Sequence, residues 1–279
     1  MCGRYVLEFD HDVYLGGEPL GADIHNYNVA PTATVPILLE RFTEESSVPT
    51  REIYPARWGL LPGWTKDASF SARTFNARSE TLFEKPSFRH AALNGHCAIP
   101  ISGYYEWKTE QLTSGKQTKT PYFIHRSDDQ PIYFAGLYEW WKITAAEANK
   151  PDSPYAKQEG QWMLSCSIIT MNAPNELAIA ELASQGHNEE TPLALSQLHN
   201  RLPVPLHFDS TNTDNLTLWL RSGKTAGQTN PPSAGALAVR TREALQTIMD
   251  NAYPQTSHWA LHPVTTAVGN VRNNGPELT

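Results

Sequence analysis

Three segments rich in aromatic and β-branched residues restrict the folds open to this chain. They occupy residues 96–107 (HCAIPISGYYEW), 130–141 (QPIYFAGLYEWW) and 161–170 (QWMLSCSIIT). In the third segment every second residue from Trp162 to Ile168 is apolar, and a period of two is typical of a β-strand. The sequence therefore predicts a fold built mainly on antiparallel strands.

Helical spacing is found in fewer places. The segment TDNLTLWLRSG has apolar residues on one helical face, with Asp214 as an N-cap and Gly223 as a stop. The segment TREALQTIMDNAY, residues 241–253, has similar spacing. Together with the strand patterns, these segments predict an α+β fold over residues 2–279, a single strand-rich domain with barrel-like antiparallel β-sheets and flanking helices.

Polar segments rich in Gly, Pro, Ser and Lys interrupt these elements. No change in composition accompanies them, so they are predicted as surface insertions and not as domain linkers. They lie at about residues 109–120, 144–160 and 222–236.

The charge of the chain narrows its function. A formal net charge of -7 argues against sequence-independent coating of nucleic acid, which normally needs a strongly basic surface. A local basic groove is still compatible with that charge. No apolar run reaches the length of a membrane span, and no basic and apolar leader opens the sequence. We therefore expect no membrane association and a cytoplasmic location.

The chain has three cysteines, Cys2, Cys97 and Cys166. They are too few and too scattered for a disulfide framework, and no C-x-x-C pair indicates zinc, so no metal and no cofactor is predicted. Cys97 and Cys166 lie in apolar strand patterns and are expected to be inert core residues.

Cys2 directly follows the initiator methionine, in the run MCGR. A terminal cysteine is usually without function, but a small second residue permits Met1 removal, which leaves an α-amine and a thiol on adjacent carbons. The amine has an ordinary pKa of about 7.7–8.0, and the Arg4 cation is expected to favour the thiolate and lower the pKa of the thiol. Such a pair attacks an acyl carbon through sulfur, or condenses with an aldehyde into a thiazolidine ring.

The segment SARTFNARSETLFEKPSFRHA combines polar, charged and aromatic residues. If it is extended, Asn76 and Arg78 point to the same side, which places an amide beside a cation. The planar fork of Arg suits phosphate, and Lys85 and Arg89 add positive charge nearby. The alternative interpretation is a solvated amphipathic surface.

Two further motifs carry groups that can transfer protons. Glu106 stands between Tyr105 and Trp107, and half-burial there would raise the pKa of its carboxyl group toward neutrality. His199 and Arg201 precede two prolines in LHNRLPVPL, a rigid setting that makes proton transfer by the imidazole plausible. An exposed carboxylate and a structural histidine are the simpler alternatives.

Trp58 lies in the run RWGLLPGW. Core packing is the default interpretation of such a tryptophan. An exposed aromatic and apolar set beside basic residues could instead support bases or wedge them apart.

Taken in order, these motifs resemble the SRAP family, the SOS-response-associated proteins that recognise abasic sites in single-stranded DNA. The motifs are MCGRY, YNVAPT, RWGLLPGW, FNARSETL, KPSFR, GYYEW, SIITMNAPN, LHNRLPVPL and HPVTTAVGNVRNNGPEL. The resemblance runs from residue 2 to about residue 278, and the ordered set is highly specific.

The resemblance implies a catalytic group of Cys2, Asn76, Glu106 and His199. Cys2, exposed after loss of Met1, would form a thiazolidine with the ring-opened deoxyribose. Asn76 would orient the sugar and the amine. Glu106 would assist Met1 removal, ring opening and crosslink reversal, and His199 would help to open the sugar. An enzyme with peptidase (hydrolase) and lyase activity is implied.

The resemblance also implies a DNA-binding set in a positively charged cleft. Arg4 and Arg78 would hold phosphates, Thr170 would add a phosphate-side contact, and Trp58 would form an apolar face on which the DNA bends. The further predicted DNA contacts are Arg201, Lys85 and Arg89. Single-stranded DNA with abasic sites is the expected partner of a monomer that meets replication-fork proteins and associates with the nucleoid during DNA damage.

Two features depart from the family pattern. Leu202 replaces the usual Met after the His-x-Arg motif, a conservative change of volume. The stretch of about residues 176–196 is longer than usual and acidic at Glu189 and Glu190, so it is predicted as a further insertion that could narrow the DNA path.

Two rival functions remain open. Class II glutamine amidotransferases also begin at a cysteine exposed from MCG, but they typically have a hydrophobic residue where this chain has Arg4, and their downstream signatures are absent. A non-covalent single-strand binding module, in which Cys2 is incidental, is the second alternative.

Overall fold

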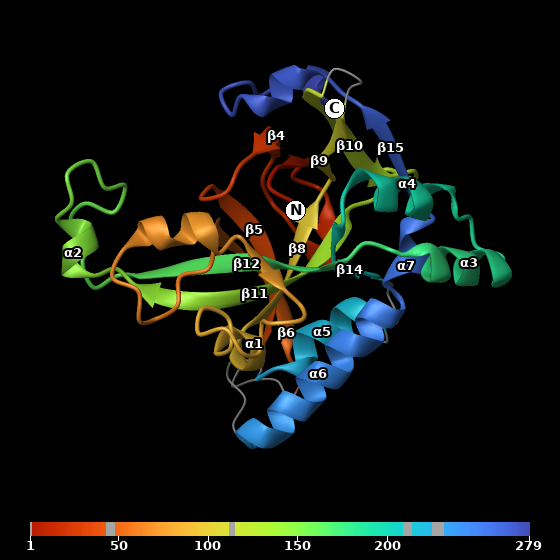
Figure 1. Ribbon diagram of the computed structural model, residues 1–279. Coiled ribbons are helices and arrows are strands. Elements are labelled where there is room, and N and C mark those ends of the chain that lie inside the picture. Colours follow the sequence, from red (N-terminus) through yellow and green to blue (C-terminus); the bar gives the residue numbers. More distant parts are fainter. Residues whose placement is uncertain (1, 43–47, 112–114, 209–213, 225–231) are drawn as a thin grey trace.

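A closed ring of five strands forms the centre of the computed structural model (Figure 1). The structure describes residues 2–42, 48–111, 115–208, 214–224 and 232–279. The ring consists of β12 (Trp162–Asn172), β6 (Thr50–Trp58), β5 (Thr34–Arg41), β8 (His96–Ile101) and β11 (Ile132–Lys142), which pairs with β12. Its pairs are antiparallel except for β12 with β6.

Three short strands extend this barrel. They are β7 (Asn76–Arg78) and β13 (Arg201–Pro203), which both pair with β12, and β14 (Pro205–Leu206), which pairs with β11. The order β7, β12, β13 matters for the site because it brings two segments that are distant in the sequence to either side of one barrel strand.

A second sheet of five strands lies beside the barrel. Its order is β15 (Trp259–Pro263), β10 (Gln117–Arg126), β9 (Gly103–Gln111), β1 (Tyr5–Phe9) and β4 (Ile24–Val29). Only Ser102 separates β8 from β9, so the chain passes directly from the barrel into this sheet. A small hairpin joins β2 (Tyr14–Leu15) to β3 (Glu18–Pro19).

Helices surround the two sheets (Figure 1). They are α1 (Ala91–Asn94), α2 (Ala145–Ala148), α3 (Glu176–Ser184), α4 (Glu190–Leu198), α5 (Asn215–Ser222), α6 (Ala234–Asp250) and α7 (Ala252–Thr256), with the 3-10 turns η1 (Ala68–Arg73), η2 (Thr266–Gly269) and η3 (Pro276–Leu278). The helices α5 and α6 pack against each other beside the barrel, and α2 lies at the far end of the β11–β12 hairpin. No helix within the described ranges is long and apolar enough to cross a membrane.

The predicted fold class is confirmed, since antiparallel sheets, a closed barrel and flanking helices form one α+β unit. The carboxylate of Asp214 accepts a hydrogen bond of 2.6 Å from the Thr217 N–H, and the α5 helix ends before Gly223, as predicted. Cys97 and Cys166 are buried in the core. The middle of β12 is buried on both faces. The alternation of apolar and polar residues in its sequence is therefore not matched by an alternation of buried and exposed side chains.

The predicted insertions have more structure than their composition indicates. Residues 109–120 belong largely to the β9–β10 hairpin, where Thr109 pairs with Lys119, because the strand hydrogen bonds extend to its tip. Residues 176–196 form α3 and most of α4. Within 222–236 the helix α6 already begins at Ala234, since Ser233 caps it. Residues 112–114 and 225–231, like Met1, lie outside the described residues. That these four stretches are insertions stays a prediction.

Candidate active site

Strand β1 positions Cys2 at the junction of the two sheets. Strand β1 runs antiparallel to β9, with Tyr5 opposite Tyr104, and the Tyr105 N–H donates a hydrogen bond of 2.9 Å to the Arg4 carbonyl. This register carries the residues before Tyr5 toward Glu106, which lies two positions after Tyr104 on β9. Cys2 and Glu106 are both buried there.

Asn76 holds the backbone of Cys2. It begins β7, whose parallel pairing with β12 sets Asn76 beside Ile168 and Arg78 beside Thr170. The Asn76 Nδ2 donates a hydrogen bond of 2.7 Å to the Cys2 carbonyl oxygen. The Asn76 Oδ1 is buried and has no hydrogen-bond partner in the described part of the chain. This oxygen can therefore accept a proton donor presented beside Cys2.

The thiol of Cys2 is kept protonated by its surroundings. Burial raises its pKa well above the ordinary value, the negative charge of Glu106 raises it further, and a backbone hydrogen bond from Arg4 acts in the opposite direction. The expectation that the Arg4 cation favours the thiolate is therefore wrong. The guanidinium is held elsewhere, since its Nη1 donates to Asn28 Oδ1 at 2.7 Å and to the Val268 carbonyl at 2.8 Å.

Glu106 is buried, with 6 % exposure. This burial excludes the exposed carboxylate that was the simpler interpretation of the sequence. One carboxylate oxygen, Oε1, accepts a hydrogen bond of 3.2 Å from the Trp107 N–H. Its charge acts on both Cys2 and His199, raising the pKa of each. Glu106 thus connects the thiol and the imidazole electrostatically.

His199 follows α4 directly and has extended backbone. Burial lowers the pKa of its imidazole, while the charge of Glu106 opposes that shift and the charge of Arg201 adds to it. The Arg201 N–H donates a hydrogen bond of 2.9 Å to His199 Nδ1. The proton of the neutral ring therefore lies on Nε2, and Arg201 fixes the tautomer.

The Arg201 side chain forms an ion pair and hydrogen bonds within the protein. It is 8 % exposed and forms a two-pronged ion pair with Glu80, with Nη2 and Oε2 at 3.0 Å. It also donates to Asn172 Oδ1 at 2.7 Å and to the Thr170 carbonyl at 2.7 Å. This ion pair lowers the pKa of Glu80. The expected DNA contact is corrected to a structural one, because both terminal nitrogens of the guanidinium are paired within the protein and Nε is buried.

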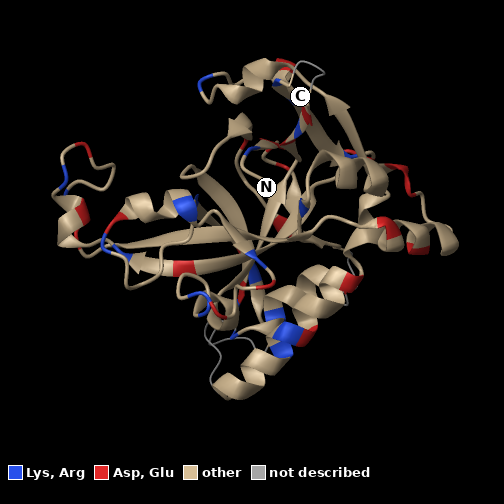
Figure 2. Cartoon of the chain, viewed as in Figure 1, with Lys and Arg blue, Asp and Glu red and all other residues tan. Residues whose placement is uncertain are grey.

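Other predicted DNA contacts are more accessible. Arg78 is exposed and lies on the same side of β7 as Asn76, which confirms the extended backbone that was expected there. Lys85 and Arg89 are exposed on the turns that follow. Figure 2 shows positive and negative residues interspersed along the sheets and helices, so the two signs of charge are not separated into different parts of the fold in this view.

Two predicted DNA contacts are buried. Trp58 has no exposed surface; its ring packs at 4.6 Å from that of Tyr5, and its Nε1 donates to the Phe75 carbonyl at 3.0 Å. Thr170 is also fully buried and receives the Arg201 side chain. The expectation of a Trp58 face for DNA is therefore corrected to a core position. In the same motif it is Trp64 that is exposed, at 57 %, and the Pro62-Gly63 pair directly before it is a turn signal that could have indicated this.

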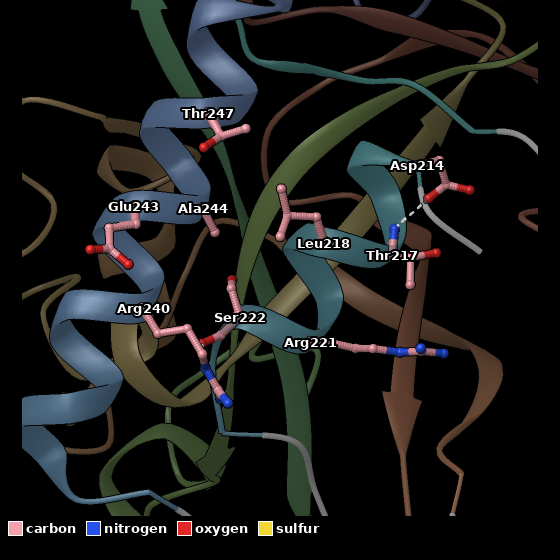
Figure 3. A pocket seen from close by; sticks show the side chains of 9 residues that line it. All are labelled: Asp214, Thr217, Leu218, Arg221, Ser222, Arg240, Glu243, Ala244 and Thr247. Carbon is pink, nitrogen blue, oxygen red and sulfur yellow. Dashed lines mark hydrogen bonds between the residues drawn. The ribbon is translucent and has the colours of Figure 1, made fainter. Parts of the chain in front are cut away.

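A cavity of about 480 Å³ lies away from these residues, between α5 and α6 (Figure 3). Its arginines are already engaged: Arg221 binds Glu40 at 2.7 Å, and Arg240 donates to the carbonyls of Ser222 and Gly223. None of the predicted site residues lines it.

One group of side chains has donor atoms close enough to bind a metal ion. Asp10, Asp23 and His25 have ligand atoms within 4.8 Å of one another, but all three residues are exposed and belong to the far end of the β1–β4 pair. Nothing in their arrangement connects them with Cys2.

Comparison with known proteins identifies a matching protein family and several similar proteins. The family model described as "SOS response associated peptidase (SRAP)" matches residues 1–271. The chain is 29 % identical to the abasic site processing protein YoqW of Bacillus subtilis (strain 168), over 100 % of this chain and 98 % of that protein. It is 31 % identical to the abasic site processing protein YoaM of the same strain, over 75 % and 76 % of the two chains.

The fold has relatives among solved structures. A crystal structure of a protein from Bordetella bronchiseptica superposes with a TM-score of 0.57 at 20 % identity, covering 95 % of this chain and 100 % of the other. At that identity the likeness supports the fold alone.

Proposed function

Because the chain belongs to the SOS response associated peptidase (SRAP) family, we propose that it captures abasic sites in single-stranded DNA by a covalent bond to Cys2. The observation that carries this proposal is the hydrogen bond of 2.7 Å from Asn76 Nδ2 to the Cys2 carbonyl. It holds the aminothiol residue in one orientation beside a buried carboxylate and an imidazole. The printed names of YoqW and YoaM, both abasic site processing proteins, support the substrate.

The first step creates the nucleophile. Hydrolysis of the Met1–Cys2 peptide bond consumes one water, releases methionine and leaves the Cys2 α-amine. We assign to Glu106 the transfer of protons in this step, because it is a buried carboxylate beside Cys2. The word peptidase in the family description supports a hydrolytic step of this kind.

The second step forms the crosslink. The neutral α-amine adds to the C1′ aldehyde of the ring-opened deoxyribose, and loss of one water gives an imine. The Cys2 S–H then adds across the C=N bond: sulfur bonds to carbon, and the nitrogen gains a proton. Since burial keeps the thiol protonated, a base must take the sulfur proton, and we assign that transfer to Glu106, a buried carboxylate whose charge acts on Cys2. Ring closure is intramolecular, which favours a long-lived product.

His199 and Asn76 complete the site. The pKa of His199 is lowered by burial, so its imidazole is mainly neutral at pH 7 and can exchange a proton with the opening sugar ring. The Asn76 Oδ1, buried without a partner in the described ranges, would accept a hydrogen bond from the α-amine or a sugar hydroxyl. Reversal of the crosslink, and any lyase activity, would use the same groups.

Exposed cations would hold the DNA backbone. Arg78 is the principal phosphate contact in this proposal because it is exposed next to Asn76, and Lys85 and Arg89 lie on the turns that follow. In this proposal Arg4 contributes through its positive charge, since its Nη1 binds Asn28 and Val268 and its Nε is buried. A monomeric state, a cytoplasmic and nucleoid-associated location and contact with replication-fork proteins stay predictions from the sequence.

Gel analysis of the protein with single-stranded oligonucleotides tests the proposal. The wild type should give an SDS-resistant adduct with an abasic oligonucleotide and none with an intact one, and Cys2→Ala should give none with either. Cys2→Ser can form an imine but cannot close the sulfur ring, so its adduct should be short-lived. A Cys2→Ser adduct of wild-type yield and lifetime, or an active protein that retains Met1 by mass spectrometry, would overturn the mechanism.

If Cys2→Ala binds DNA as the wild type does and the wild type forms no adduct, the chain is a non-covalent binding module. A thioester with glutamine at Cys2 would instead support an amidotransferase-like hydrolase.

A further inference from the structure

An aromatic groove lies where β11 and β12 run beyond the closed part of the barrel. We define it by its exposed or half-buried rings and its floor: Tyr54, Trp140, Tyr155, Trp162 and Leu164. Its volume is about 360 Å³. Trp140 and Trp162 are 46 % and 61 % exposed, an unusual amount for two tryptophans on adjacent strands.

Strand register explains why these rings gather. Trp140 pairs with Leu164 and Lys142 pairs with Trp162 across the β11–β12 ladder. Because side chains alternate along a strand, all four share one face, while Trp141 lies on the other face and is buried. The Tyr54 ring meets Trp140 edge to face at 6.4 Å.

The cationic side chains at the groove differ in how they are engaged. Lys142 Nζ lies over the Trp162 ring at 6.0 Å. The Arg57 guanidinium lies over the Tyr155 ring at 5.8 Å, but it donates hydrogen bonds to the Ser71 hydroxyl, the Thr32 carbonyl and the Tyr155 hydroxyl. No Asp or Glu is among the described residues that line the groove. The Glu52 carboxylate accepts a hydrogen bond from the Tyr54 hydroxyl and pairs with Arg41. The chain as a whole has a net charge of -7. A groove with a lysine at its edge and no carboxylate among its described lining residues is locally better suited to an anionic ligand.

We propose that the aromatic groove is a second subsite for single-stranded nucleic acid, in which bases stack on Trp140 and Trp162 while Lys142 faces a phosphate. Stacking rings combined with a cation are the chemistry that binds single strands without sequence preference. A proline-rich peptide would also fit aromatic rings, but it carries no charge that would use the lysine.

The subsite lies within reach of the site at Cys2, and in that respect the inference rests on the proposed function. Strand β12 carries both, since Ile168 pairs with Asn76 and Trp162 lines the groove. The two positions are roughly 20 Å apart along the strand at about 3.3 Å per residue. A single strand held at Cys2 therefore needs only a few nucleotides to reach the groove.

The test measures binding by the full-length protein of two labelled 20-mers, oligo-dT and a chain of tetrahydrofuran spacers. Both carry the same phosphates, only oligo-dT has bases, and neither can form an aldehyde, so the result does not depend on crosslinking. We expect the wild type to bind oligo-dT roughly tenfold more tightly than the spacer chain. Trp140→Ala with Trp162→Ala should remove most of that preference, and Lys142→Glu should weaken binding of both ligands.

The control is Tyr14→Ala, which removes an aromatic side chain of 65 % exposure outside the groove and should leave both affinities unchanged. Thermal unfolding and circular dichroism compare the folding of each variant with that of the wild type. An unchanged preference for oligo-dT in a folded double variant overturns the inference, as does a proline-rich peptide that binds the groove while oligo-dT does not compete. Failure of the adduct with abasic DNA, with the base preference intact, would overturn the proposed function and leave the subsite standing.

Discussion

The Nδ2 atom of Asn76 donates a hydrogen bond of 2.7 Å to the carbonyl oxygen of Cys2. This bond joins the start of β7 to Cys2, three positions before β1 begins, and nothing in the local sequence brings the two together. Its function in the proposal is to orient the aminothiol before the aldehyde arrives.

Asn76→Ala should slow adduct formation roughly 100-fold, because a misplaced nucleophile loses most of the benefit of being held in position. Single-turnover gels with abasic oligonucleotide measure the rate. Asn94→Ala is the matched control, since Asn94 also donates its Nδ2 to a backbone carbonyl, that of His90, but lies on α1 outside the site. Equal rates for Asn76→Ala and the wild type would remove Asn76 from the mechanism.

Substitutions of Arg78 and Arg201 should have different effects, although both residues were predicted to contact DNA. Arg78→Ala removes an exposed cation, so the slope of log affinity against log salt should become shallower by about 0.7 for a single strand. Arg201→Ala removes a buried side chain from its pair with Glu80 and should lower the free energy of unfolding by about 2 kcal/mol. Binding titrations in salt and urea denaturation measure the two effects. A shallower salt slope for a fully stable Arg201→Ala would contradict the assignment.

Glu106→Gln should change the pH dependence at Cys2. The Glu106 charge raises the pKa of the thiol, so its removal lowers that pKa, and the rise in crosslinking rate that accompanies ionisation of the thiol should begin at lower pH. Reversal of the crosslink should also slow by roughly 100-fold because a proton-transfer group is lost. The control Glu110→Gln changes an exposed carboxylate on the same strand, paired with Lys108. Reversal kinetics that match the wild type would exclude Glu106 as the proton carrier.

His199 should make the fold less stable in mild acid. Its pKa in the folded protein is lowered by burial, while Glu106 and Arg201 shift it in opposite directions. The unfolded chain therefore binds this proton first as pH falls below about 6.5, and unfolding becomes easier until the folded pKa is passed. Urea denaturation at pH 7 and pH 5.5 should show a larger loss for the wild type than for His199→Gln. Equal losses would show that the imidazole titrates alike in both states.

Local sequence patterns were enough to predict individual strands and helices. The alternation from Trp162 to Ile168 predicts a strand, and Asp214 predicts the start of a helix. Both signals depend only on neighbours in the chain, and both elements are present in the structure. The strands within residues 109–120 could not be predicted from the Gly, Ser and Lys composition, which is that of a turn, because the pairing of β9 with β10 depends on the partner strand.

The partners within the site could be predicted less well. Glu80 follows Arg78 in the same alternation, yet its pairing with Arg201 requires β12 to lie between β7 and β13. Burial of Trp58 likewise depends on Tyr5 and Phe75 closing around it. Motif order identified which residues meet, but only the tertiary fold shows which of them face solvent and which are already paired.

The anchor of Arg4 joins two segments that are far apart in the sequence. Arg4 Nη1 binds the carbonyl of Val268, and Asn28, which also holds Arg4, donates to the carbonyls of Val268, Asn270 and Asn273. Arg4 and Val268 are separated by 264 positions in the sequence. The backbone that leads from Cys2 into β1 is therefore held by a distant turn as well as by its neighbouring strands.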